Sequence, residues 1–309
     1  MSYEVPKVVV IGGPTGCGKT AFSVMLAEKL DAEILNADSM QVYRGMDIGT
    51  AKPTADEKRG ITHHLLDIVN PDEAFNAARY RSEALPIIRD IRRRGKVCLV
   101  VGGTGLYIKG LLGGLFSAPP ADSSLREKLR SEIQDVGPKV LHQRLTMLDP
   151  DAAGDIHPND RVRIVRALEL IALTGRRPSE LARQHAFGDR DVRGLMLCLE
   201  RDREDLYERI EKRTDQMIRS GLKEETEGLL RSGYSPQLKP MKALGYRHMK
   251  AHLLEGMPLS DAVEQMKRDT RRYAKRQMTW FRSDPSTRWV ASGDASRVLT
   301  MIEGFLTGQ

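Results

Sequence analysis

The sequence predicts an α/β protein in which a parallel sheet is interrupted by a helical insertion. The first observation is a short β-branched run at 8–11 that is followed by a glycine-rich loop and a helix pattern. The second is that further apolar runs of strand length alternate with helix patterns, which favours parallel strands joined by helices. The third is a segment with helix patterns only. We therefore expect an α/β core from 1–115 and 195–309, with 116–194 inserted as a helical domain.

The loop after the first predicted strand fits the pattern G-x-x-x-x-G-K-[ST] in full. It consists of Gly13, Pro14, Thr15, Gly16, Cys17, Gly18, Lys19 and Thr20. Glycines let backbone N–H groups converge on one point, and the helix that starts here adds partial positive charge. Lys19 supplies a full charge and Thr20 a hydroxyl for Mg²⁺. The core is thus predicted to be P-loop NTPase-like and to bind a polyphosphate. The ligand could be ATP, GTP or a diphosphate.

The composition is ordinary for a soluble protein, with a basic balance. The 309 residues carry 49 Lys and Arg against 42 Asp and Glu, a net charge of +7, which modestly favours a polyanionic partner. There is no apolar stretch of about 18 residues for a membrane span, and the first strand starts too early for a signal peptide. We therefore expect a cytoplasmic monomer. The three cysteines stand singly, which fits neither a zinc site nor a disulfide framework.

A second strand at 33–37 delivers Asp38 to its carboxyl end, the edge where sites form in open α/β sheets. Asp38 is expected near the phosphate loop, where it could hold Mg²⁺ through water or accept a proton. The alternative is that it caps a helix. The mixed segment 42–53 is typical of a ligand-facing loop. His63 and His64 are adjacent on a predicted strand and would point to opposite faces, so we expect no metal site there.

The strand predicted at 97–101 follows a helix at 76–94 and ends in Gly102 and Gly103. P-loop hydrolases place an acidic residue for Mg²⁺ at the end of such a strand. The missing acid weakens a nucleotide-hydrolase interpretation, and a glycine turn suits close approach by a substrate.

The insertion begins with an expected linker at 117–120. Three helices are predicted after it, at 124–134, 139–148 and 161–173, with helix breakers between them. In the last one Val162, Val165 and Leu168 are expected to face the core. Arg163 and Arg166 lie on another face, where they either contact phosphates or are solvated.

After a strand at 195–199, the helix predicted at 202–221 can overhang the phosphate loop. Arg213 is the candidate for a bidentate phosphate clamp, and Arg209 is one turn away. The alternative is that both arginines form ion pairs with acids one turn away on the same helix.

The last long helix is predicted at 261–282 with Ser260 as its cap. Its inner face is expected to consist of Val263, Met266, Thr270, Tyr273 and Gln277. Its other face is basic and consists of Lys267, Arg268, Arg271, Arg272, Lys275, Arg276 and Arg282. A charge run of one sign favours contact with a nucleic-acid backbone over a plain solvated face.

Together these motifs resemble the bacterial tRNA dimethylallyltransferases over nearly the whole chain. The segments that carry the resemblance are 12–20, 36–43 (Asn-Ala-Asp-Ser-Met-Gln-Val-Tyr), 46–53 (Met-Asp-Ile-Gly-Thr-Ala-Lys-Pro), 64–67, 102–107, 157–160, 166–169 and 244–247, with Arg163. The P-loop alone is common to many families, whereas 36–43 and 46–53 in tandem are highly specific.

The resemblance implies transfer of the dimethylallyl group from dimethylallyl diphosphate to N6 of the adenosine 3′-adjacent to the anticodon, in tRNAs that read codons beginning with U. The P-loop would hold the donor's diphosphate, with Mg²⁺ on Thr20. Asp38 would take the proton of the attacking amine. Lys19, Thr20 and Arg213 would stabilise the leaving diphosphate. The adenosine would be flipped out of its stack to reach the site.

The resemblance also implies contacts with the tRNA anticodon arm. The implied residues are Asp38, Ser39, Met40, Gln41, Thr104, Arg126, Val162, Arg163, Ile164, Val165, Arg166, Lys242, Ala243, Leu244, Gly245, Tyr246 and Arg247. Two of these positions depart from the family pattern: relatives often carry glutamine in place of Val162 and arginine in place of Lys242.

Three other functions are compatible with parts of the sequence. A nucleotide or small-molecule kinase shares the P-loop and the acid at a strand end, but the third strand has no acid. An adenylate isopentenyltransferase acts on a free nucleotide, which the basic last helix and the insertion do not favour. A non-catalytic RNA-binding protein would have no use for a complete P-loop with Asp38 beside it.

Overall fold

The computed structural model describes residues 5–114, 119, 122–185 and 191–308, which form two compact units. The core unit comprises Met1–Leu112 and Asp191–Gln309, and the helical unit comprises Gly113–Arg190. The boundaries expected from the sequence, 115/116 and 194/195, lie within a few residues of these. Apart from Pro119, the linker expected at 117–120 lies outside the described residues.

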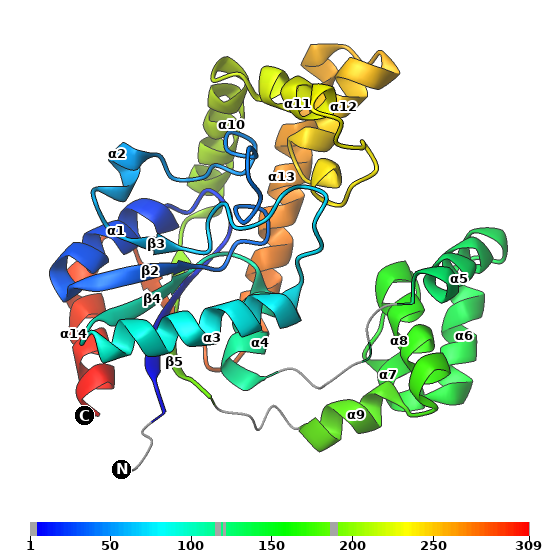
Figure 1. The fold of residues 1–309 in the computed structure, drawn as a ribbon, viewed down its shortest axis with the longest axis horizontal. Coiled ribbons are helices and arrows are strands. Elements are labelled where there is room, and N and C mark those ends of the chain that lie inside the picture. Colours follow the sequence, from blue (N-terminus) through cyan, green and yellow to red (C-terminus); the bar gives the residue numbers. More distant parts are fainter. Residues whose placement is uncertain (1–4, 115–118, 120–121, 186–190, 309) are drawn as a thin grey trace. The chain divides into compact units, whose positions relative to one another are not determined.

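A parallel sheet forms the middle of the core unit (Figure 1). Its described strands are β1 (Lys7–Gly12), β2 (Ala32–Asn36), β3 (His63–His64), β4 (Val97–Val101), β5 (Arg193–Glu200) and β6 (Arg288–Ala291), in the spatial order β3-β2-β4-β1-β5-β6. The predicted α/β fold is therefore confirmed. In the register of the sheet, Val10 of β1 lies between Val100 of β4 and Met196 of β5. The chain leaves β1 toward β2 and later returns on the other side at β5, which makes the end of β1 a switch point where ligands bind.

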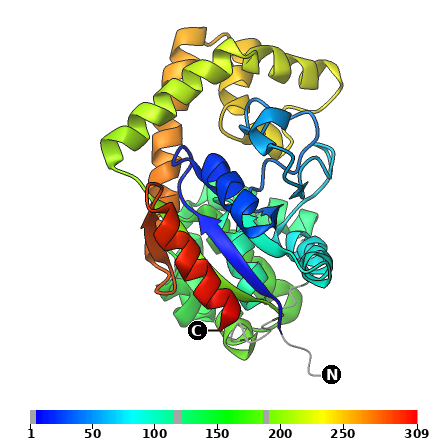
Figure 2. The same ribbon diagram turned by 90° about the vertical axis from the view of Figure 1, so that its left-hand side faces the viewer.

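Helices cover both faces of this sheet, because its strands are buried on both sides and carry apolar side chains in both directions. Val9 and Ile11 pack with α1 (Lys19–Leu30) and α14 (Ala295–Thr307). Val8 and Val10 pack with α3 (Ala77–Arg93) and α4 (Gly105–Gly113). Figures 1 and 2 show α1 and α14 along one side of the strands and α3 along the other.

Further helices lie beyond the carboxyl ends of the strands. They are α10 (Arg203–Arg219), α11 (Leu222–Arg231), α12 (Tyr246–Glu255) and α13 (Leu259–Arg282), with the 3-10 turn η1 (Pro240–Lys242). The short α2 (Ala55–Lys58) packs against α1 instead. α10 and α12 both pack against α11 and α13. The long α13 thus joins these upper helices to the sheet, where Phe281 is part of the core.

The prediction for α13 is confirmed in part for its inner face and is wrong for its start. Met266, Thr270 and Gln277 are buried, whereas Val263 and Tyr273 are half-buried. The predicted cap is wrong: the helix begins at Leu259 after Pro258, and the Ser260 hydroxyl bonds to Asp261 instead. The helix thus starts two residues earlier than a Ser260 cap would place it, directly after Pro258, whose ring fixes its φ near −55°.

The helical unit has its own core. Its described helices are α5 (Ser123–Asp135), α6 (Pro138–Leu148), α7 (Pro150–Gly154), α8 (Arg161–Thr174) and α9 (Pro178–His185). Val165 and Leu168 of α8 are buried as predicted, but the prediction for Val162 is wrong, because 80% of this residue is exposed. Val162 lies in the first turn of α8, and burial in this helix begins only at Ile164, which packs with α5 and α6.

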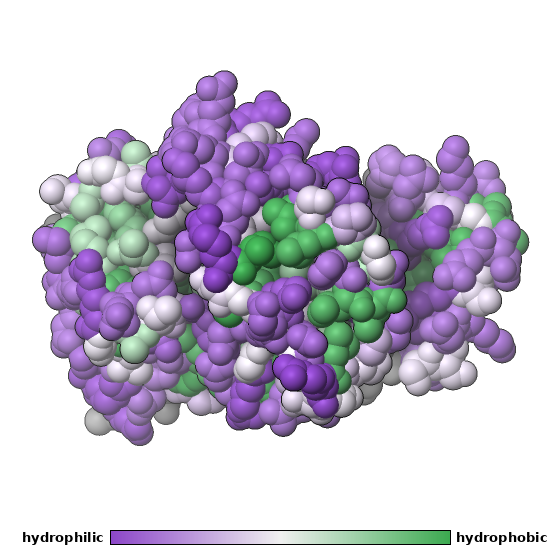
Figure 3. All heavy atoms as spheres, turned by 90° about the horizontal axis from the view of Figure 1, so that it is seen from above, coloured by the Kyte–Doolittle hydropathy of each residue, from purple (hydrophilic) through white to green (hydrophobic). Residues whose placement is uncertain are grey.

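No helix within the described parts of the chain combines the length and the apolar character needed to cross a bilayer. Figure 3 shows hydrophilic residues over most of the face that it presents, with apolar residues in smaller groups between them.

Glu33 on β2 is a buried acid that joins two other elements. Its carboxylate lies 2.8 Å from Nη2 of Arg94, after α3, and 2.7 Å from Nε2 of His64 on β3. Hydrogen bonding to Arg94 lowers the pKa of Glu33 to about 2, and His64 acts in the same direction, against the effect of burial. His63 turns away from this group and bonds to the carbonyl oxygen of Ile61.

We expect Glu33→Gln to lower the free energy of unfolding at pH 7 by roughly 1–3 kcal/mol, because Arg94 loses its buried counter-charge. The folded-state pKa lies below the unfolded-state value of 4.5, so the stabilisation is present above that pH and is lost as the pH falls toward 2. Urea unfolding at pH 7, 5, 4 and 3 should therefore show a shrinking difference between the proteins. Glu303→Gln on the exposed side of α14 is the control, and a pH-independent difference would contradict the assignment.

Candidate active site

The phosphate loop follows β1 and leads into α1. Three of its glycines have left-handed backbone conformations, with φ of +141° at Gly13, +86° at Gly16 and +97° at Gly18. A side chain at any of these positions would strain the backbone, and at Gly13 it would also meet the Cys17 sulfur at 2.9 Å. α1 begins at Lys19, so the first backbone N–H groups of this helix are free to bind an anion.

The loop's polar side chains are held at its mouth. Lys19 Nζ donates to the carbonyl oxygens of Gly13 (3.0 Å) and Pro14 (2.8 Å), which places the ammonium group across the loop. Thr20 lies next to it in the first turn of α1 and is half-buried. Cys17 is fully buried among the apolar side chains between β1 and α1. Its contribution to the site is therefore its backbone.

Thr15 forms hydrogen bonds with residues of two helices. Its N–H donates to Gln277 Oε1 of α13 (2.8 Å), and its hydroxyl accepts a hydrogen bond from Arg213 of α10. The Gln277 amide in turn donates to the carbonyl oxygen of Gly103 (2.9 Å). This buried glutamine thus ties the phosphate loop to the loop after β4.

Both arginines proposed as clamps reach the phosphate loop. Arg213 is half-buried, and its pKa is lowered by desolvation, against the attraction of Asp38. Arg209 is exposed and donates to the carbonyl oxygen of Gly16 (3.0 Å). The ion-pair alternative is wrong for both, because the acids one turn away bind other partners: Asp205 pairs with Arg201 and Glu208 with Lys212.

Asp38 lies directly after β2 and faces the same space. Its Oδ1 accepts the N–H of Met40 (2.8 Å), and its own N–H donates to the Asn36 side chain (3.0 Å). Thr104 fixes the next residue, since its hydroxyl accepts the N–H of Ser39 (3.0 Å). The helix-cap alternative is wrong, because a turn and not a helix follows Asp38. One oxygen of Asp38 is thus held, while no hydrogen bond to the other is found within the described residues.

The end of β4, beside β1, is closed by two glycines. A Cβ on Gly102 would lie 2.3 Å from the carbonyl group of Ala37, and one on Gly103 would lie 2.2 Å from the Gln277 amide nitrogen. The backbones after β2 and β4 therefore touch. This contact fixes the position of Asp38 relative to the phosphate loop.

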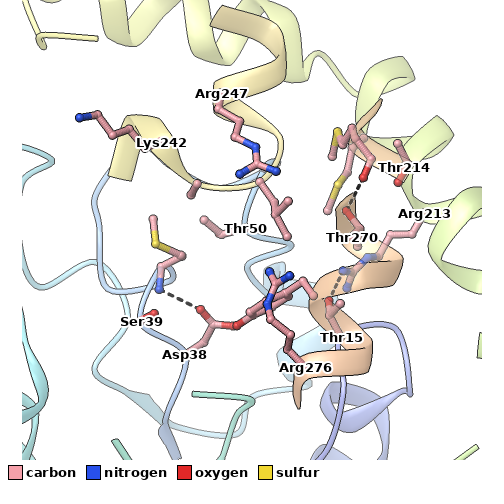
Figure 4. A pocket seen from close by; sticks show the side chains of 17 residues that line it. Thr15, Asp38, Ser39, Thr50, Arg213, Thr214, Lys242, Arg247, Thr270 and Arg276 are labelled. Atoms are coloured by element: carbon pink, nitrogen blue, oxygen red, sulfur yellow. Dashed lines mark hydrogen bonds between the residues drawn. The ribbon is translucent and has the colours of Figure 1, made fainter. Parts of the chain in front are cut away.

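Asp38 and Thr15 form the floor of a pocket of about 300 Å³ in the core unit (Figure 4). The residues of the predicted set that line it are Thr15, Asp38, Ser39, Met40, Arg213, Lys242, Ala243, Leu244 and Arg247. Figure 4 shows Lys242 and Arg247 on the side opposite Asp38, and Arg276 beside the carboxylate. Arg213, Arg247, Arg276 and Lys242 outweigh the single acid, so the pocket favours anionic ligands.

The other predicted RNA-binding residues of the core unit are mostly internal. The Gln41 amide donates to the carbonyl oxygens of Thr50 (3.2 Å) and Ala51 (3.1 Å). Tyr246 is fully buried and Gly245 is buried beside it. In the structure these side chains hold the pocket walls together and do not form an exposed surface.

In the helical unit the predicted residues divide into exposed and internal ones. Val162 and Arg163 are exposed, whereas Ile164 and Val165 are buried. Arg126 and Arg166 both bond, at 2.7 Å, to the fully buried carboxylate of Glu169, which lowers the pKa of that acid against the effect of burial. In the structure these two arginines therefore serve as partners of a buried acid.

The basic face of α13 is partly neutralised. Lys267 pairs with Asp215 (2.9 Å) and Arg271 with Glu211, both from α10. Arg268, Lys275 and Arg276 remain exposed. The residues available to an anionic partner are thus fewer than the sequence indicates, and of the basic set only Arg276 lines the pocket.

Sequence reasoning missed several residues of the site. Gln277 was expected only as an inner-face residue, and Tyr273, Met217, Thr214 and Arg276 were not linked to the pocket that they line. Glu225, which organises two walls of the pocket, was not considered. These residues lie far from the motifs along the chain, and single polar residues in amphipathic helices carry no local signal of their contacts.

Residues 41–284 match the model of a family described as IPP transferase. A protein named tRNA dimethylallyltransferase from Desulfosudis oleivorans is 49% identical over 302 residues, which cover 97% of this chain and 96% of the relative. The crystal structure of the tRNA isopentenylpyrophosphate transferase from Bacillus halodurans matches with a TM-score of 0.71 at 40% identity, over 98% of this chain and 96% of that one. A eukaryotic dimethylallyltransferase, described as acting on tRNA, matches with a TM-score of 0.81 at 31% identity, over 98% and 80%.

The family model spans most of the chain, and relatives of this similarity extend over nearly all of it. The chain is a transferase that belongs to the IPP transferase family.

Proposed function

We propose that this enzyme transfers the dimethylallyl group of dimethylallyl diphosphate to N6 of the adenosine 3′-adjacent to the anticodon in tRNAs that read codons beginning with U. The observation that carries the proposal is a single cationic pocket onto which both the phosphate loop, through Thr15, and Asp38 open. β4 lies beside β1 and is followed by Gly102, at the position where a nucleotide hydrolase needs an acid. This supports a prenyl diphosphate over ATP as the ligand.

The donor's diphosphate would lie on the free N–H groups of the loop and of the first turn of α1. Lys19 would move from the loop carbonyls to the diphosphate, and Arg213 would approach from the opposite side. Charge develops on the diphosphate as the bond between C1 of the prenyl group and oxygen breaks. The N–H groups of the loop and of the first turn of α1 are already in place, and such donors lower the barrier because they need no reorganisation.

The residues present fit Mg²⁺ as cofactor. Thr20 offers one hydroxyl, and no cluster of three or more metal-binding side chains occurs within the described residues, so the diphosphate would supply further oxygen ligands. When bound, the ion would neutralise charge on the leaving diphosphate.

Asp38 would serve the acceptor as general base. As N6 of adenine forms its bond to C1, the amine must lose a proton, and the free oxygen of Asp38 can take it. The two products are the N6-dimethylallyl adenosine and diphosphate. The pocket lies inside the core unit, so the adenosine would enter it in a flipped conformation. Lys242 and Arg247 at the opposite wall would bind phosphates of the anticodon arm.

The test uses an unmodified transcript of a tRNA with adenosine 3′ of the anticodon. The enzyme is incubated with this RNA, Mg²⁺ and labelled dimethylallyl diphosphate, beside a reaction with labelled ATP and no prenyl donor. We expect the label to move to that adenosine, as nucleoside analysis would locate it. Consumption of ATP without prenyl transfer would replace the proposal with the kinase.

A further inference from the structure

Glu225 on α11 accepts four hydrogen bonds. Its Oε2 accepts the backbone N–H groups of Asp47 (2.9 Å) and Ile48 (2.8 Å). Its Oε1 accepts the N–H of Gly49 (3.1 Å) and the O–H of Tyr246 (2.6 Å). A carboxylate has about four acceptor positions, so this group is saturated. Three of its four donors are consecutive backbone groups of one loop.

The loop and the helix that Glu225 joins are two walls of the pocket. Gly49 and Thr50 line it from the loop, and Lys242, Ala243, Leu244 and Arg247 line it from the segment between η1 and the first turn of α12. The walls touch each other, since a Cβ on Gly49 would lie 2.5 Å from the Tyr246 ring. Glu225 does not line the pocket itself. Any influence that it has on a ligand therefore acts through these walls.

The donor side of the pocket is held independently. Thr15 is fixed by Gln277 and Arg213, and Lys19 by loop carbonyls, and none of these residues contacts Glu225. On the acceptor side, in contrast, the Glu225 carboxylate joins the backbone N–H groups of 47–49 to Tyr246, about 200 positions later in the sequence.

We propose that Glu225 is a positioning residue that shapes the pocket for the RNA acceptor and not for the prenyl donor; this inference rests on the proposed function. Replacement by glutamine keeps the size of the side chain but turns one acceptor atom into an NH₂ donor. That NH₂ group would face either two N–H groups or an N–H and the Tyr246 O–H. At least one bond is lost on either orientation, and the loop is released from α11.

The first test measures the loop directly. We expect amide hydrogen exchange in peptides covering 46–50 to become at least tenfold faster in Glu225→Gln, while peptides of the phosphate loop exchange as in wild type. Glu224→Gln is the matched control, because Glu224 is the exposed neighbour, and its ion pair is with Lys223 at 3.8 Å. Unchanged exchange at 46–50 would overturn the clamp, whether or not the enzyme transfers prenyl groups.

The second test separates the two substrates. Glu225→Gln should raise the Kd for an unmodified anticodon stem-loop and the KM for tRNA about tenfold, and leave the KM for dimethylallyl diphosphate within twofold of wild type. Tyr246→Phe removes a single donor, should fold readily, and should show the same pattern at smaller size. Equal changes in both KM values would assign Glu225 a general structural role. A wild-type enzyme without transfer activity would refute the proposed function, while the stem-loop Kd would still decide for or against the clamp.

Discussion

Asp38→Ala is expected to reduce the single-turnover rate of prenyl transfer by roughly 10²–10⁴, the range that a positioned general base contributes. Asp38 is the one acid among the residues that line the pocket, and alanine removes its free oxygen. Binding of tRNA should persist, because the walls with Lys242 and Arg247 do not depend on Asp38. Rapid-quench assays with saturating donor and filter binding of the tRNA would measure the two effects.

Asp38→Asn distinguishes proton transfer from positioning. The asparagine oxygen can still accept the N–H of Met40 and preserve the turn, but the side chain cannot take a proton. If Asp38 is the base, Asn should lose nearly as much rate as Ala. A turnover within threefold of wild type in Asp38→Asn would leave Asp38 a purely structural role.

Arg213→Ala is expected to lower kcat/KM for dimethylallyl diphosphate by roughly 10²–10³, which is the usual cost of removing one preorganised donor to a developing anion. Arg213 lines the pocket and bonds to Thr15 at the phosphate loop, and desolvation strengthens its field there. Steady-state kinetics with varied donor, together with inhibition by inorganic diphosphate, would measure the loss. The inhibition constant should rise in parallel with the loss of rate.

Arg209→Ala is the matched comparison, one helical turn away. Arg209 is exposed and bonds to a loop carbonyl, so its charge is screened by solvent, and we expect less than a tenfold effect. Arg213→Lys should recover part of the activity, because it restores charge without the bidentate fork. The opposite order, with Arg209 the more costly change, would make Arg209 the clamp.

The buried strands of the sheet could be predicted because they are continuous apolar runs. β1, β2, β4 and β5 fall within a few residues of their predicted positions. β6 was not predicted, since it has only one buried residue in four and so has no apolar run of its own. Val162 shows a different limit of prediction from spacing. It has the spacing of a core residue, but it lies at a helix end, which extends beyond the neighbouring helices that bury the middle turns.

The site was predictable where one short segment carries the chemistry. The phosphate loop needs left-handed glycines and a helix start, which leave a pattern in eight consecutive residues. Asp38 could be placed because strand ends share one edge of a sheet. Gln277 and Glu225 could not be placed in this way, since they bind backbone groups of distant segments. Every residue type carries such groups, so the sequence does not mark the partners.

The two glycines at the end of β4 also constrain how this core can change in evolution. An acid at position 102 would displace Ala37, which carries Asp38, and an acid at position 103 would displace the amide of Gln277, which holds Thr15. An acid at either of these two positions would therefore move a residue on the floor of the pocket in the same step. The acid of a nucleotide hydrolase and the present arrangement of Asp38 and Thr15 are thus mutually exclusive at this strand end.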